Sequence, residues 1–193
     1  LLAAARNRDV KAVVAMTPAA HMWEGHTMRF FSPDYRPVSS WSLGGRPLPY
    51  VPFKVSPQEK EIYARGELAS FVSFFRDGLA QADPETAAQA AIPVESIGGP
   101  ILLISGTDDR IWPAGEFCAS ILARLKKAGF AHEARHVIIE KGGHMSCIPS
   151  LVTANRGLLI DGDPSGGSPQ ADARGGYRSW AETMAFFHRS LDR

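Results

Sequence analysis

The stretch PILLISGTDDRIWP (residues 100–113) decides the fold of this chain, together with the later stretch HVIIEKGGHM (residues 136–145). Each begins as an apolar run rich in β-branched residues, which is typical of a buried strand. Each then ends in a glycine-containing loop that carries a side chain able to exchange a proton, Asp109 in the first and His144 in the second. Because the carboxyl ends of parallel strands form one edge of a sheet, we expect these two side chains to meet there.

The rest of the chain alternates short apolar runs with helical patterns. Residues 10–16 form a third β-branched run, which we expect to be a buried strand. Capping signals and apolar spacing predict helices that begin at or near Leu1, Ser56, Leu68, Asp83, Pro113 and Tyr177. Strands that alternate with helices imply right-handed crossovers, so the pattern predicts an α/β fold with a mostly parallel sheet and flanking helices.

The last predicted helix has an apolar stripe that we expect to dock it against the rest of the fold. The residues of the stripe are Tyr177, Trp180, Met184, Phe187 and Leu191. They recur at a spacing of three or four, which places them on one face of a helix.

Composition and charge exclude several classes of protein. The 21 basic and 20 acidic residues leave a net charge of +1, which gives no electrostatic reason to expect a nucleic acid partner. No run approaches the roughly 18 apolar residues of a membrane span. The two cysteines, Cys118 and Cys147, are expected to be free thiols, as in a reducing compartment. No signal peptide or C-terminal peroxisomal tripeptide is visible, so we expect a cytoplasmic location.

Asp109 and His144 are the candidate catalytic residues. A carboxylate in the loop after a strand can accept the Nδ1–H of a histidine and orient its ring, and the pattern favours Asp109 over Asp108 for this role. The alternative is that both aspartates only cap the following helix. His144 follows Gly142-Gly143 and could act as a general base, although a single histidine can also be structural. His136 is expected to be packed or capping.

A nucleophile is the remaining requirement of such a site. In an α/β-hydrolase the nucleophile sits in a G-x-S-x-G elbow between a strand and a helix, and this chain has no such pattern. Ser105, at a strand end, and Ser146, in the histidine loop, do not fit that position. We therefore expect the nucleophile strand and elbow to lie before Leu1. His21 and His26 lack zinc-site spacing, so we expect no metal.

The residues GTDDRIWPAGEFCASILARLKKAG, followed by a strand and KGGHM, resemble one known family. They are similar to the C-terminal domain of the acyl-CoA thioesterase and bile acid-CoA:amino acid N-acyltransferase family, an α/β-hydrolase domain. The similarity runs from about Val10 onward and includes IPVES and SWAETMAFFHRSL. It implies a Ser (or Cys)–Asp–His triad that cleaves an acyl thioester, with Asp109 as the acid and His144 as the base. In this family serine favours hydrolysis, and cysteine is associated with transfer to an amino acid.

The expected organisation is a single, partial α/β-hydrolase domain over residues 1–193. It would carry an irregular insertion over residues 21–53, rich in proline and aromatic residues, and a lid-like loop over residues 147–176. The expected substrate is an acyl-CoA thioester or an ester, with no further cofactor. We also expect self-association, or pairing with the missing N-terminal portion, because the strand over residues 10–16 would be an apolar edge.

Two alternatives remain open at this point. One is a carboxylester hydrolase similar to dienelactone hydrolase, because Asp and His loops alone fit any α/β-hydrolase. The other is a non-catalytic binding or assembly module, because the chain shows no nucleophile elbow.

Overall fold

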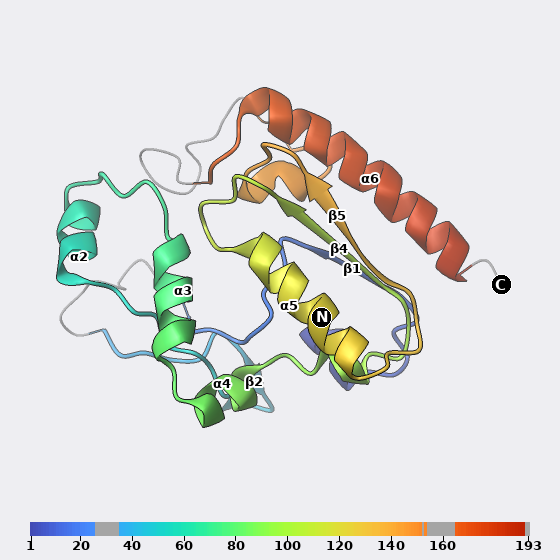
Figure 1. Ribbon diagram of the computed structural model, residues 1–193, viewed down its shortest axis with the longest axis horizontal. Coiled ribbons are helices and arrows are strands. Elements are labelled where there is room, and N and C mark those ends of the chain that lie inside the picture. The colour runs from blue at the N-terminus through green and yellow to red at the C-terminus, as the bar shows by residue number, and fades with distance from the viewer. Residues whose placement is uncertain (26–34, 152, 154–164, 192–193) are drawn as a thin grey trace.

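The centre of the protein is a parallel sheet of three strands, in the order β1-β4-β5 (Figure 1). The strands are β1 (Val13–Met16), β4 (Ile101–Gly106) and β5 (Ala134–Ile139). This computed structural model describes residues 1–25, 35–151, 153 and 165–191. All strand pairs in this sheet are parallel, which confirms the predicted α/β fold. Among the described residues, no strand pairs with the outer edge of β1.

The central strand β4 is buried on both faces, which explains its unbroken apolar sequence. Ile101 and Leu103 belong to the core cluster that includes buried residues of α5 (Ala114–Lys127). Leu102 and Ile104 belong to a second cluster with Phe186 of α6 (Pro169–Leu191). Helices α5 and α6 therefore cover opposite faces of the sheet, as Figure 1 shows.

The shorter elements follow their capping signals. Ser56 and Glu59 form the predicted capping box of α2 (Pro57–Ala64): the Ser56 hydroxyl accepts from the Glu59 N–H, and the Glu59 carboxylate accepts from the Ser56 N–H. Asp83 caps α4 (Pro84–Ala90) by accepting from the Thr86 N–H at 2.9 Å. The remaining elements are α1 (Leu2–Arg6), the hairpin of β2 (Ser42–Leu43) and β3 (Arg46–Pro47), α2 (Pro57–Ala64), α3 (Val72–Gln81), α4 (Pro84–Ala90) and the 3-10 turns η1 (Val94–Ser96) and η2 (His144–Cys147). No helix in the described parts of the chain is long and apolar enough to cross a membrane.

An aromatic cluster joins the irregular segment over residues 21–53 to the helices. Trp23 is buried, and its ring lies 6.1 Å from that of Phe53, 4.9 Å from that of Phe75 in α3 and 5.8 Å from that of Phe117 in α5. A single bridge between His21 and Ala91 also ties this segment to the end of the helix over residues 84–90, and the bridge between Trp23 and Val51 lies within the segment. Residues 26–34, including His26, lie outside the described residues.

The terminal helix docks through a different face from the one that its apolar stripe predicts. The helix is docked, as predicted, but Tyr177 is 80% exposed and Trp180 is 53% exposed, so the stripe is not the docked face and only its member Phe187 packs against the core. The face that is buried carries Asp172, Gly175, Gly176, Ser179, Thr183 and Phe186. Small residues form most of this buried face because the helix axis lies close to η2, where large side chains would not fit. Helix α6 also begins at Pro169, so the expected loop over residues 147–176 is helical in its last part.

Replacing Gly175 by alanine tests this close packing. A Cβ at Gly175 would lie 2.6 Å from the carbonyl oxygen of Ser146 and 2.6 Å from a methyl of Ile139. We expect Gly175→Ala to lower the free energy of unfolding by about 2 kcal/mol through overpacking, although alanine is the better helix former. The control Trp180→Ala should change it by less than about 0.5 kcal/mol, as exposed positions do. Urea unfolding of both variants measures this, and a stabilised Gly175→Ala would contradict the close contact.

The two cysteines are free, as predicted, and both are buried. Burial raises the pKa of the Cys118 thiol to about 12 and that of the Cys147 thiol to about 11. Both groups are therefore thiols at neutral pH, and neither is an activated nucleophile.

These raised pKa values predict slow thiol chemistry in the folded protein. At pH 8 the thiolate fraction of Cys118 and Cys147 is very small and access is blocked, so we expect no fast reaction with Ellman's reagent. After unfolding in guanidinium chloride, both thiols should react, so that two equivalents of Ellman's reagent are consumed per protein chain. Fast labelling of either thiol in the native protein would contradict the burial.

Candidate active site

The loops that follow β4 and β5 lie in contact at the carboxyl edge of the sheet. The N–H of Thr107 donates to the Ile139 carbonyl at 3.0 Å, and the N–H of Asp108 donates to the Gly142 carbonyl at 2.9 Å. A Cβ at Gly106 would clash with the Gly142 carbonyl, so only glycine allows this approach. The glycines of the two sequence motifs therefore bring the loops together.

This contact places Asp109 and His144 side by side. The Asp109 Oδ2 lies 2.9 Å from the His144 Nδ1, and the Asp109 side chain is only 3% exposed. Its other oxygen, Oδ1, accepts from the N–H of Ile111 at 3.0 Å and from that of Trp112 at 3.1 Å. One carboxylate thus orders its own loop and also contacts the imidazole, and it does not cap α5, which has no side-chain cap.

Trp112 fixes the other side of the imidazole. Its ring lies edge-on to that of His144, with the centroids 4.9 Å apart. The Trp112 indole N–H donates to the carbonyl of Thr17, just after β1, at 3.1 Å. With Nδ1 engaged by Asp109, Nε2 is the nitrogen of His144 that can exchange a proton with a reacting group.

A cavity of about 680 Å³ lies beside His144. Its wall continues from Trp112 to Phe75, whose rings are 5.7 Å apart, and from Phe75 to Trp23. The wall also includes Met16, Thr17, Phe53, Ile92 and Ile111. An apolar pocket with few polar groups is typical of a site for a small hydrophobic ligand. The sequence signals this wall only through its density of aromatic residues.

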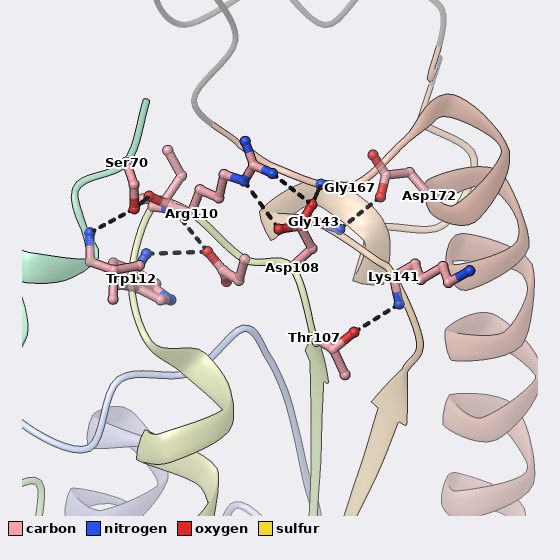
Figure 2. A network of polar contacts seen from close by, with 12 residues as sticks. Ser70, Thr107, Asp108, Arg110, Trp112, Lys141, Gly143, Gly167 and Asp172 are labelled. Carbon is pink, nitrogen blue, oxygen red and sulfur yellow. Dashed lines mark hydrogen bonds and ion pairs between the residues drawn. The ribbon is translucent and has the colours of Figure 1, made fainter. Parts of the chain in front are cut away.

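Asp108 lies in the same loop as Asp109 and has different partners. It pairs with Arg110 at 3.1 Å, and its Oδ2 accepts from the N–H of Gly167 at 2.8 Å (Figure 2). The capping alternative therefore fails for Asp108, because helix α5 has no side-chain cap.

The other residues that the sequence offered for the site either lie away from His144 or have buried side chains. The Ser105 hydroxyl lies 2.8 Å from the His136 Nε2, and burial lowers the pKa of His136, which favours the neutral ring. Ser105 and Ser146 are both buried, and the Ser146 hydroxyl donates to the Gly143 carbonyl at 2.7 Å. His21 lines the cavity. Among the described residues, no group of three or more His, Cys, Asp or Glu side chains is placed to hold a metal ion.

A parallel sheet with a hydrogen-bonded Asp–His pair at its carboxyl edge, next to an apolar cavity, is the arrangement of the α/β-hydrolases. The chain belongs to the BAAT / acyl-CoA thioester hydrolase C-terminal family, which matches residues 2–193. This confirms the resemblance inferred from the motifs. The chain is also similar to human acyl-coenzyme A thioesterase 6, with 28% identity over 109 residues. That match covers 54% of this chain and 25% of the human protein.

Proposed function

We propose that this domain takes part in the hydrolysis of acyl-CoA thioesters, with Asp109 as the acid and His144 as the base of a Ser (or Cys)–Asp–His triad. The observation that carries the proposal is the 2.9 Å contact between Asp109 Oδ2 and His144 Nδ1 beside an apolar cavity. The family and the thioesterase relative support the thioester as the substrate class.

In the first half of the reaction, His144 Nε2 takes the proton of a serine or cysteine nucleophile presented at the same edge of the sheet. The nucleophile attacks the thioester carbonyl, and the tetrahedral intermediate collapses by breaking the carbon–sulfur bond. The proton held on His144 passes to the leaving sulfur, so coenzyme A departs as a thiol. In the second half, water gives its proton to His144 and attacks the acyl-enzyme, which releases the acid and returns the proton to the nucleophile.

Asp109 makes this proton transfer possible without accepting the proton itself. Its Oδ2 holds Nδ1–H, which fixes the tautomer in which Nε2 can accept, and it stabilises the imidazolium that forms. Because the carboxylate is almost fully buried, solvent screens this interaction little. The aromatic wall that begins at Trp112 would hold the acyl chain away from water.

A substrate panel tests the proposal against the ester alternative. The full-length protein that carries this domain is assayed with acyl-CoA thioesters and with p-nitrophenyl esters of the same acyl chains. We expect the thioesters to have the higher kcat/KM, with free acid as the product by mass spectrometry. Preferential cleavage of small esters would favour a dienelactone-hydrolase-like enzyme. An amide product formed with added amino acid would indicate acyl transfer, and no turnover of any substrate would favour a binding or assembly module.

A further inference from the structure

Residues 165–172 cross over both loops of the candidate site, and we call this segment the strap. The His144 N–H donates to the carbonyl of Ser165 at 2.7 Å, and the Gly143 N–H donates to the Asp172 Oδ1 at 2.9 Å. The Gly167 N–H donates to the Asp108 Oδ2 at 2.8 Å. The strap is therefore bonded to the histidine loop at two points and to the aspartate loop at one. Figure 2 shows the contacts of Asp172 with Gly143 and of Gly167 with Asp108.

The strap packs closely against both loops. Gly166 and Gly167 have φ values of +72° and +74°, which is the left-handed region that favours glycine. A Cβ at Gly166 would lie 2.9 Å from the Arg110 Cγ, and one at Gly167 would lie 2.9 Å from the Gly143 Cα. The backbone of the strap therefore lies in close contact with both loops.

Asp172 connects the strap to a rigid element. It is 5% exposed and sits in the first turn of α6, the long helix that packs on the sheet. A buried carboxylate is costly unless it is hydrogen-bonded, and here one oxygen receives the N–H of Gly143, directly before His144. The helix thereby supplies the hydrogen bond to the Gly143 N–H, while the Gly142 carbonyl accepts from Asp108 and the Gly143 carbonyl accepts from Ser146.

We propose that Asp172 is a positioning residue for His144: by holding the Gly143 N–H, it keeps Nδ1 of His144 within hydrogen-bond distance of Asp109. This role of Asp172 adds to the proposed function, and its importance for catalysis rests on that function. The positioning itself is a property of the Asp109–His144 pair, so it can be measured without turnover.

The test follows the ring proton on Nδ1 of His144 in the 193-residue protein labelled with ¹⁵N-histidine. The variants are Asp172→Ala, Asp172→Asn and the matched control Thr183→Ala, at another buried polar position on the same helix. In Asp172→Ala we expect this proton to exchange with water about tenfold faster, because a charge-assisted hydrogen bond is lost. Asp172→Asn keeps an oxygen for the Gly143 N–H and should stay within about threefold of the wild type. Thr183→Ala should leave the exchange rate unchanged.

Unchanged exchange in a folded Asp172→Ala protein would overturn the proposal, as would equal acceleration in Thr183→Ala. If Asp172→Ala does not fold, Asp172→Ser takes its place, because it keeps a polar atom at this buried position while its oxygen lies one bond closer to the backbone and away from the Gly143 N–H. Faster exchange in that variant supports the proposal, and no change overturns it. In the full-length protein, Asp172→Ala should lower kcat and leave KM unchanged. If exchange accelerates but the full-length wild-type protein cleaves no thioester, the positioning stands and the proposed function fails.

Discussion

Asp109→Asn is expected to lower kcat for thioester hydrolysis roughly 10³–10⁴-fold in the full-length protein while leaving it folded. The asparagine amide can place its N–H₂ toward Nδ1, which would leave the proton on Nε2 and remove the base. The remaining oxygen can still accept from the backbone of Ile111 and Trp112, so the loop should keep its shape. Stopped-flow or steady-state hydrolysis of an acyl-CoA measures the effect.

The control for this prediction is Asp77→Asn, the same chemical change on the exposed side of α3. It should leave kcat within twofold, since the residue lies outside the candidate site. Activity near that of the wild type in Asp109→Asn would show that Asp109 only orders its own loop. A matching loss in the control would point to a general effect of the substitution.

The second large effect is expected on stability, from Gly106→Ala at the end of β4. The added Cβ would clash with the Gly142 carbonyl, a backbone atom that cannot rotate away. We expect the free energy of unfolding to fall by about 3 kcal/mol, since overpacking of this kind forces backbone shifts. The Asp108–Gly142 hydrogen bond would also lengthen, and the two loops of the site would separate.

Gly98→Ala is the matched control, because a Cβ there meets nothing within 4 Å. Gly98→Ala should leave the free energy of unfolding unchanged or raise it by up to about 1 kcal/mol, because alanine lowers the conformational entropy of the unfolded chain. Urea unfolding of the 193-residue protein compares the two. Equal stability of Gly106→Ala and Gly98→Ala would mean that the loops do not need the close approach at Gly106.

The strands and the Asp109–His144 contact could be predicted because their signals are local. A β-branched run followed by a glycine loop defines a strand end, and parallel order brings strand ends to one edge. The register that aligns Ile104 with Val137 was not part of this prediction. Nothing beyond the order of elements was needed to place the two side chains together.

The docking face of α6 could not be predicted, because apolar periodicity does not record how close a helix must come to its neighbour. The stripe with Tyr177 and Trp180 has the stronger hydrophobic pattern, yet the short distance to η2 selects the face with Gly175 and Gly176. The role of Asp172 was missed for a related reason. An aspartate in the first turn of a helix is usually a solvated charge, and only the fold shows that it reaches Gly143.

The most direct test of the central claim is a double-mutant cycle of Asp109→Ala and His144→Ala on kcat/KM for acyl-CoA hydrolysis. If Asp109 acts only through His144, each single variant loses most of the activity and the double variant is about as active as His144→Ala alone. Losses that multiply in the double variant would show two independent roles. Wild-type activity in either single variant would contradict the pairing of these residues as acid and base.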